Sequence, residues 1–564
     1  MFTPATAEQR FVLDHIVRVH ELSDEASPDL VEAVLEGAGA FAAGEWAPLE
    51  RAGDTVGAKW TEDGVVMPAG FAAAYKAYVE GGWGTIGSPP AFGGQGLPVS
   101  LAAAVLETMG TANMGFALAP ILTVGTIEAL MHHGTVAQQT AYLPHLATGA
   151  WTGTMNLTEP QAGSDVGALR TRAEPRAGGG WSITGTKIFI SFGDHDMAGN
   201  IVHLVLARTP DAPAGTRGIS LFLVPKYRLN PDGNPGEFND VRVVSIEHKM
   251  GLHASPTCVL GFGDKGDCIG ELVGPEMGGI RAMFTMMNNA RLNVGLQGVQ
   301  VAERATQRAV AYARDRIQGT RMGAPAAIVE HPDVRRMLMR MKAQTQAARA
   351  LVYYAFGQLD RAHAGDAAAE ARVGLLTPLA KAHGTDLGCE VASLGVQVHG
   401  GMGYIEETGA AQHFRDARIT PIYEGTNGIQ AADLVGRKLA QDNGGTLFAL
   451  LAEMRGDAED AGLAALIDAC EDVTRHLLGA DTDDRLAGSY PFLTMLSVAV
   501  CGWLMEAQAR AAAGAQGDPA FLAMKIAAAR FHVGQIVPEA LGLKAAATAS
   551  AAALYAVDAA AFAT

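Results

Sequence analysis

The spacing of hydrophobic residues changes twice along the chain. Residues 1–150 place apolar side chains three or four positions apart, which predicts helices. Thr6 and Gln9 are spaced as in a capping box ahead of the first helix, and Ser27-Pro28 precedes a second one. Between residues 81 and 97 the chain is rich in glycine and proline and lacks the Gly-Lys-Ser/Thr sequence of a phosphate-binding loop. We expect an irregular loop there.

After Trp151 polar and apolar residues alternate, which is the period of a β-strand. Short β-rich runs follow one another at intervals of roughly a dozen residues, separated by Gly, Pro and Asp. This pattern predicts a compact antiparallel β domain. The expected strands are residues 181–191, 201–207, 219–224, 241–246 and 257–261.

From Gly278 onward the helical period returns over long stretches. Four long helices are expected at residues 293–316, 332–360, 367–398 and 426–442, and four such helices form a bundle. Gly444-Gly445 marks a boundary, after which the chain is alanine-rich and helical. The fold class is therefore α+β and mostly α. The expected domains are a helical extension (1–35), an α domain (36–150), a β domain (151–275), a bundle (276–445) and an additional helical domain (446–564).

Composition narrows the class of protein. The chain has 564 residues, 49% of them hydrophobic, and a formal net charge of −17, which argues against general affinity for nucleic acid or anionic membranes. Its five cysteines form no C-x-x-C pair, and the N-terminus has no signal-peptide pattern, so we expect a cytoplasmic location. Residues 486–505 carry no charge, yet Gly488, Ser489, Pro491 and Thr494 interrupt them, which favours a buried helix over a membrane span.

One carboxylate lies in a position suited to chemistry. Glu424 stands in the sequence R-I-T-P-I-Y-E-G-T-N-G-I-Q (418–430), where Pro421 disfavours helix at Thr420 and Thr426 can cap the helix that follows. A carboxylate at a helix N-terminus lies near unpaired backbone N–H groups and can be directed at a ligand. For an arbitrary glutamate, an exposed acid in a first helical turn is the more common situation.

Three further stretches are candidates for a site. Residues 155–165, M-N-L-T-E-P-Q-A-G-S-D, combine small residues with hydroxyls, although for this stretch alone a capped turn is the more common explanation. Residues 397–404 read Q-V-H-G-G-M-G-Y, and residues 187–191 read K-I-F-I-S. Asp194-His195-Asp196 has the residue types of a metal site, but adjacent residues rarely converge on one ion, so a loop is expected and no metal.

Together, T-E-P-x-A-G-S-D, the K-I-F-I-S strand, Q-x-x-G-G-x-G and Y-E-G-T resemble, in order, the signatures of the acyl-CoA dehydrogenase family. The resemblance covers about residues 36–440. The F-I-S-x-G-D-H-D sequence and the additional C-terminal region are similar to a long bacterial branch of that family. The resemblance implies an N-terminal helical domain, a middle β domain and a helical bundle.

The resemblance also implies an FAD enzyme that oxidises an acyl-CoA to its trans-2-enoyl-CoA, with Glu424 as the base that removes the α-proton. Implied substrate contacts are Ser164, Asn288, Arg291 and Gly425. Implied FAD contacts are Met155, Leu157, Thr158, Ser164, Phe189, Ile190, Ser191, Arg316, Gln397, Gly400, Gly401, Thr426 and Asn427. Phe189 replaces the family's usual tryptophan, Asn288 its usual aspartate, and I-Q-G-T after Arg316 its usual K-T-F-G.

The expected acyl group is 3-methylmercaptopropionyl or a short or medium straight chain. The expected acceptor is an electron-transferring flavoprotein, and the expected assembly is a homodimer. One alternative is an acyl-CoA oxidase, which passes electrons to O₂. Another is a non-dehydrogenating paralogue that binds nucleic acid through a basic C-terminal domain. Residues 446–564 speak against the latter, because they hold 14 acidic and 7 basic residues.

Overall fold

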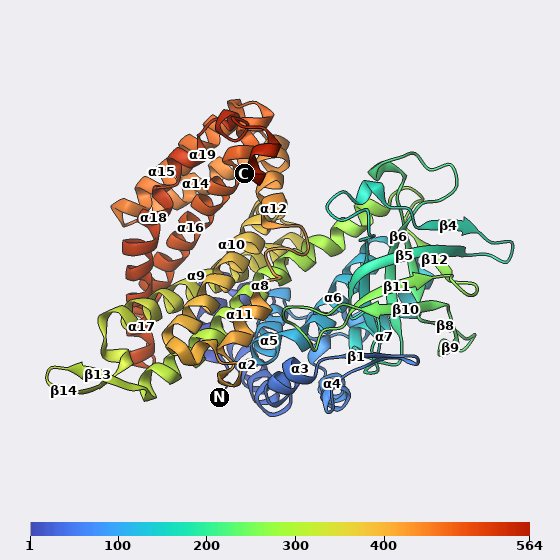
Figure 1. The fold of residues 1–564 in the computed structure, drawn as a ribbon, viewed down its shortest axis with the longest axis horizontal. Coiled ribbons are helices and arrows are strands. Elements are labelled where there is room, and N and C mark those ends of the chain that lie inside the picture. The colour runs from blue at the N-terminus through green and yellow to red at the C-terminus, as the bar shows by residue number, and fades with distance from the viewer. Residues whose placement is uncertain (1) are drawn as a thin grey trace. The chain divides into compact units, whose positions relative to one another are not determined.

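The computed structural model describes residues 2–564, and these form two compact units. One contains residues 36–290, and the other contains residues 3–35 with residues 291–564. The division falls within α2 (Pro28–Phe41) and α8 (Gly279–Asp315). The expected mostly helical α+β fold is confirmed (Figure 1).

The helices of the first unit precede its sheet. They are α3 (Glu50–Val56), α4 (Phe71–Glu80), α5 (Val99–Ala112), α6 (Met114–His133) and α7 (Val136–Thr148), and a small hairpin pairs β1 (Lys59–Thr61) with β2 (Gly64–Val66). Thr135 and Gln138 form a capping box at the start of α7. Helix α6 is apolar along most of its length, and 15 of its residues are buried, as expected for a helix that protein surrounds.

An eight-stranded sheet forms the β domain, in the order β10-β11-β5-β12-β7-β6-β3, with β4 paired to β5. Its pairings are antiparallel except β3 with β6, which is parallel, so the expectation of a wholly antiparallel sheet was wrong at this edge. The strands are β3 (Thr152–Asn156), β4 (Arg172–Pro175), β5 (Trp181–Ser191), β6 (Ile201–Ala207), β7 (Ser220–Pro225), β10 (Val241–Ile246), β11 (Thr257–Phe262) and β12 (Ile269–Val273); β8 (Tyr227–Leu229) and β9 (Pro235–Phe238) form a separate hairpin.

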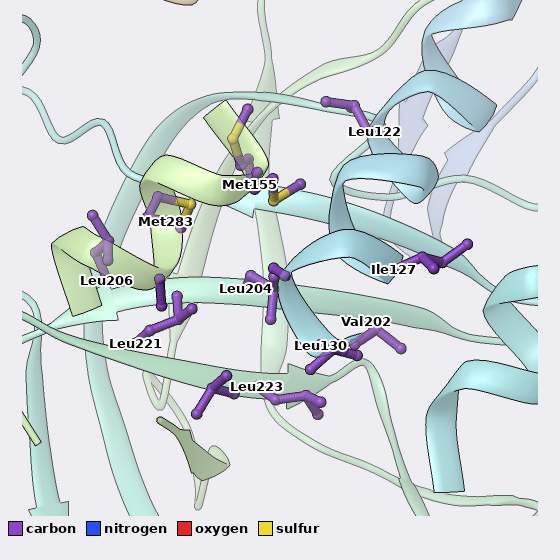
Figure 2. Close-up of a cluster of buried hydrophobic side chains, with 14 of the residues drawn as sticks. Leu122, Ile127, Leu130, Met155, Val202, Leu204, Leu206, Leu221, Leu223 and Met283 are labelled. Carbon is purple, nitrogen blue, oxygen red and sulfur yellow. The ribbon is translucent and has the colours of Figure 1, made fainter. Parts of the chain in front are cut away.

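Both faces of the sheet are covered, which explains why β6 and β7 are buried along their whole lengths. Val202, Leu204 and Leu206 of β6 pack on one side with α6 and the start of α8, as Figure 2 shows. Val205 and Ala207, the alternate residues, join a second cluster on the other side. Alternate residues of β6 therefore pack into two separate hydrophobic cores, one on each face of the sheet.

The second unit contains most of α8 and the long helices α9 (Pro332–His363) and α10 (Ala367–His399). Helix α8 is followed by a hairpin of β13 (Ile317–Arg321) and β14 (Ala324–Ala327). After α11 (Ala410–Ala417), α12 (Asn427–Asp433) continues through a π-helical turn, Leu434–Lys438, into α13 (Leu439–Gln441). The four helices expected from the sequence are confirmed, although α8 begins 14 residues before the expected start at 293.

The additional C-terminal helices pack directly on this bundle. They are α14 (Gly445–Asp457), α15 (Ala461–Gly479), α16 (Thr482–Gly514), α17 (Pro519–Phe531), α18 (Val537–Leu541) and α19 (Lys544–Ala547). Helix α16 contacts α9, α10 and α12, and Figure 1 shows it in orange beside them. Among residues 2–564, three helices are long and apolar enough to cross a membrane by length and composition: Met114–His133, Thr482–Gly514 and Pro519–Leu541, whose most apolar windows are 83%, 78% and 39% buried.

The N-terminal extension belongs to the same unit as the bundle. Helix α1 (Thr6–Val12) and the π-helical turn after it pack on α9. Glu8 is buried beside Lys525 of α17, with Glu8 Oε2 and Lys525 Nζ 3.0 Å apart. The expected capping box at Thr6 was wrong: Thr6 already lies inside the helix, and the N-cap is Ala5, which has no side-chain oxygen to accept a bond.

Candidate functional site

The Glu424 loop has a strained backbone. Glu424 has φ +57° and Gly425 has φ +84°, so two successive residues adopt the left-handed conformation, which is uncommon for a glutamate. Thr426 then caps α12, with its Oγ1 accepting a bond from the Ile429 N–H at 3.2 Å. The expected loop and cap are confirmed. Strain of this kind persists where surrounding groups hold the backbone in place, as they do at many active sites.

Side chains from three helices hold this loop by its carbonyl groups. Arg291 Nε of α8 donates to the Glu424 carbonyl at 3.3 Å, and Lys381 Nζ of α10 donates to the Gly425 carbonyl at 2.8 Å. Gln430 Nε2 of α12 reaches the Glu424 carbonyl at 3.3 Å. The Tyr423 hydroxyl donates to Gln297 Oε1 of α8. The backbone that carries the Glu424 side chain is therefore held in place by the bundle.

Burial and two cations set the acidity of Glu424. Desolvation raises the pKa of its carboxyl, and the positive charges of Arg291 and Lys381 oppose part of that rise. Lys381 is itself fully buried, and desolvation lowers its pKa to about 7. A carboxylate whose pKa is raised by desolvation is a stronger base, which suits it to taking a proton from a weak carbon acid.

The expected flavin contacts of the β domain lie at the end of β3 and on β5, which contact each other. Met155 is buried, and Leu157 and Thr158 are half-buried just beyond β3. The Phe189 side chain is 58% exposed, with φ +60°, at a bulge where the register between β5 and β11 shifts. Ile190 is buried and Ser191 half-buried on the same strand. An exposed aromatic ring beside a hydroxyl and backbone amides fits a flat polar ring system such as an isoalloxazine.

A buried ion pair holds the segment that carries Leu157 and Thr158. Lys187 Nζ of β5 donates to Glu159 Oε1 at 2.8 Å and to the Leu157 carbonyl at 3.0 Å. Glu159 also accepts bonds from the Arg170 and Thr171 N–H groups and from Thr171 Oγ1. Glu159 of T-E-P and Lys187 of K-I-F-I-S thus stabilise the backbone of residues 157–159.

The remaining predicted residues fall in two environments. Ser164 and Asn288 are exposed in the unit of the β domain, and Arg316, Gln397, Gly400 and Gly401 are exposed in the unit of the bundle. The side chain of Asn427 is buried: its Oδ1 accepts from Lys381 Nζ at 2.8 Å, and its Nδ2 donates to Asp386 Oδ1 at 2.8 Å. Asn427 therefore supports the base loop. The contacts of all these residues with FAD or CoA remain predictions.

The Asp194-His195-Asp196 side chains bond to neighbouring segments of the β domain and the β1–β2 hairpin. Asp194 accepts from the Val65 N–H at 3.0 Å and pairs with Lys226, and Asp196 accepts from the Met67 N–H at 3.1 Å. His195 Nε2 lies 2.8 Å from Thr152 Oγ1. Within residues 2–564 no group of three His, Cys, Asp or Glu side chains could hold a metal ion.

A recess of about 360 Å³ lies between the N-terminal extension, α9 and α16, apart from the base loop. Its charged side chains are largely paired with one another. Arg372 bonds the Tyr354 hydroxyl at 2.9 Å and Glu453 at 2.7 Å, and Asp457 accepts from Trp503 Nε1 at 3.1 Å. We assign no ligand to it.

Sequence reasoning missed Lys381, Gln297 and Gln430, which together hold the base loop. Lys381 left a faint signal, because it stands between two alanines in a mostly apolar helix. The two glutamines left none.

The chain matches models of known protein families over four segments. Residues 29–150, 154–264 and 277–439 match the family models described as the N-terminal, middle and C-terminal domains of acyl-CoA dehydrogenase. Residues 447–558 match a model described as acetyl-CoA dehydrogenase C-terminal like. The chain belongs to the acyl-CoA dehydrogenase family, and the expected oxidoreductase class and FAD cofactor are confirmed with it.

Two relatives and one solved structure place the chain more closely. It is 46% identical over 562 residues to 3-methylmercaptopropionyl-CoA dehydrogenase of Ruegeria pomeroyi, covering 94% of this chain and 95% of that protein. It is 36% identical to the broad-specificity linear acyl-CoA dehydrogenase of Mycobacterium tuberculosis, with 84% of each covered. The fold matches acyl-CoA dehydrogenase of Bacillus anthracis complexed with FAD, at a TM-score of 0.76, 23% identity and coverage of 97% and 92%.

Proposed function

We propose that this protein is an FAD-dependent acyl-CoA dehydrogenase that converts 3-methylmercaptopropionyl-CoA, or a short- or medium-chain acyl-CoA, to the trans-2-enoyl-CoA. The observation that carries the proposal is the Glu424 carboxylate, desolvated on a strained loop whose carbonyls are held by Arg291 and Lys381. The 46% identity to 3-methylmercaptopropionyl-CoA dehydrogenase supports this acyl group.

Glu424 is the general base. An α-proton of a thioester is a very weak acid, so its removal requires a base that lacks hydration and is already aimed at the carbon. The Glu424 carboxylate takes this proton, and its main-chain N–H is the expected donor to the negative charge that develops on the thioester oxygen. FAD, when bound, supplies the two-electron acceptor for the hydride that leaves the β-carbon. Lys381 and Arg291 remain in place, and their charges favour the ionised form of the carboxylate against its desolvation.

The residues of the β domain that fit the flavin are Met155, Leu157, Thr158, Phe189, Ile190 and Ser191, with Ser164 toward the pyrophosphate or pantetheine. Arg316, Gln397, Gly400, Gly401 and Thr426 complete the proposed FAD set from the bundle, and Asn427 supports the loop beside it. Arg291, Asn288 and Gly425 are proposed to lie toward the CoA thioester. Gly425 suits this position because a side chain there would meet Gln430 Nε2 at 2.8 Å, so the backbone is left bare for a close approach.

A panel of thioesters tests the substrate. Steady-state rates with an artificial electron acceptor would be measured for 3-methylmercaptopropionyl-, propionyl-, butyryl-, hexanoyl-, octanoyl- and palmitoyl-CoA. The proposal predicts the highest kcat/KM for 3-methylmercaptopropionyl-CoA, with butyryl-CoA or hexanoyl-CoA next. A maximum at palmitoyl-CoA would refute the substrate, and no flavin bleaching with any thioester would refute the function.

The acceptor is proposed to be an electron-transferring flavoprotein, by the family resemblance alone. Coupling to a purified electron-transferring flavoprotein should regenerate the oxidised flavin far faster than dissolved O₂. Rapid hydrogen peroxide release without an artificial acceptor would identify an oxidase instead.

We also propose a cytoplasmic homodimer without a membrane span. Burial of most of the apolar window in Met114–His133 and in Thr482–Gly514 supports the absence of a span. Sedimentation of detergent-free protein as a dimer is the expected result. Recovery in the membrane fraction would contradict it, and salt-sensitive retention on DNA would favour the nucleic-acid-binding alternative.

A further inference from the structure

The additional C-terminal domain reaches the base loop through a chain of hydrogen bonds. The Tyr490 hydroxyl of α16 donates to Asp386 Oδ2 of α10. The other oxygen of that carboxylate, Oδ1, accepts from Asn427 Nδ2 at 2.8 Å. Asn427 Oδ1 accepts from Lys381 Nζ, which also donates to the carbonyl of Gly425. These hydrogen bonds run in series from Tyr490 through Asp386, Asn427 and Lys381. The last one ends on Gly425, the residue after Glu424.

From this geometry we propose that Tyr490 is a positioning residue for the dehydrogenation, and that residues 446–564 support catalysis by holding the base loop through this series of hydrogen bonds. The proposal rests on Glu424 being the base. Helix α16 also packs on α12 and on the π-helical turn after α12. Because α12 starts immediately after the base loop, this packing supports a role for residues 446–564 in holding the loop.

The physical reason lies in how Asp386 and Asn427 are held. A carboxylate that accepts bonds from two side chains, one on each of its oxygens, is fixed in position. Without the Tyr490 hydroxyl, Asp386 Oδ2 turns to water, since Asp386 is only half-buried. Asn427 then loses its fixed partner, and so does the ammonium of Lys381. The strained backbone at Glu424 and Gly425 is left with fewer groups to hold it.

The charged groups around the loop determine how activity responds to pH. Arg291 of α8 and Lys381 of α10 both lower the pKa of Glu424, against its desolvation. Asp386 and Glu424 favour the charged form of Lys381, while Arg291 disfavours it. Weakening the hold on Asp386 therefore reduces the positive charge beside Glu424 near neutral pH.

Asp433 and Arg437, on the helix after the base, act on Arg291 with opposite signs. Tyr423 lies beside Glu424 on the loop itself. None of these three groups takes part in the series of hydrogen bonds that starts at Tyr490. Their effect on Glu424 and Arg291 is therefore the same in the wild-type enzyme and in the variants of Tyr490, Asp386 and Thr494 described below. The ascending limb of the kcat–pH profile should consequently move to higher pH when Tyr490 loses its hydroxyl.

The test compares Tyr490→Phe with the full-length, FAD-loaded enzyme. Phenylalanine fills the same space at a residue that is 39% exposed, so the fold is retained. Thr494→Val is the matched control, because the Thr494 hydroxyl lies one turn further along α16 and bonds only the Tyr490 carbonyl, at 3.2 Å. Asp386→Asn is isosteric and removes the charge itself.

The expected result is a fall in kcat of roughly three- to thirtyfold for Tyr490→Phe, with little change in KM, because positioning of the base matters more in the transition state than in binding. The ascending limb moves to higher pH in Tyr490→Phe and further in Asp386→Asn, and stays in place in Thr494→Val. Hydrogen exchange of the peptide spanning residues 419–434 rises in Tyr490→Phe but not in the control.

Two outcomes would overturn the inference: a kcat–pH profile of Tyr490→Phe that coincides with the control, or unchanged exchange in the 419–434 peptide. The exchange measurement needs no turnover. An inactive wild-type protein would therefore refute the proposed function while the role of Tyr490 was still decided by exchange.

Discussion

Glu159→Gln should destabilise the β domain far more than a surface change of the same kind. Glu159 and Lys187 are 4% and 0% exposed, and the variant leaves the Lys187 ammonium buried without an ionised partner. Burial disfavours the ionised carboxylate, yet Lys187, Thr171 and the Arg170 N–H lower the pKa of Glu159 to about 2, from an ordinary 4.5. A difference of that size corresponds to about 3 kcal/mol in favour of the charged form. Breaking a buried pair from one side costs a similar amount, about 3–5 kcal/mol.

Differential scanning calorimetry at pH 7 measures this effect. For a unit the size of residues 36–290, about 3 kcal/mol lowers the midpoint by roughly 6–12 °C. Glu174→Gln is the control, since Glu174 is exposed on β4. Because the folded pKa is the lower one, the contribution is fully present above pH 4.5 and is lost as pH falls toward about 2. A midpoint for Glu159→Gln within about 1 °C of the control would refute the reasoning.

Three further predictions follow from the same contacts. Lys381→Met removes a cation that lowers the pKa of Glu424, so the ascending limb of the kcat–pH profile should move to higher pH and kcat at neutral pH should fall about tenfold; an unchanged limb would contradict this. Phe189→Ala should change stability by less than about 0.5 kcal/mol, because the ring is 58% exposed, yet weaken FAD binding about tenfold in a fluorescence titration of deflavinated protein. Lys525→Met removes the partner of Glu8 on α17, while Lys342 stays 3.3 Å from Glu8 Oε1, so it should cost about 1–3 kcal/mol, seen as an earlier unfolding transition of the bundle; no shift would show the Glu8–Lys525 pair to be dispensable.

The sequence was informative where a residue acts through its neighbours in the chain. Pro421 and Thr426 predicted the loop and cap around Glu424, and the alternation in residues 181–191 predicted β5 with the bounds that the structure shows. Helix period alone predicted α9 and α10 closely.

It was uninformative where contacts join distant segments. Tyr490 lies 104 residues from Asp386, and Lys525 lies 517 residues from Glu8, so no local pattern connects them. The parallel pairing of β3 with β6 joins two strands that are separated along the chain by β4 and β5, and a strand pattern carries no information about direction. The expected capping box at Thr6 failed because helix α1 includes Thr6.

The central claim is that Glu424 removes the α-proton while FAD accepts the hydride. The most direct measurement is anaerobic stopped-flow reduction of the flavin by the preferred acyl-CoA, in the wild-type protein and in Glu424→Gln, both FAD-loaded. The wild-type flavin should bleach rapidly and without an external acceptor. The variant should bind the thioester, seen as a perturbed flavin spectrum, but reduce the flavin about a hundred- to ten-thousandfold more slowly. Bleaching of the variant at a near wild-type rate would contradict the account.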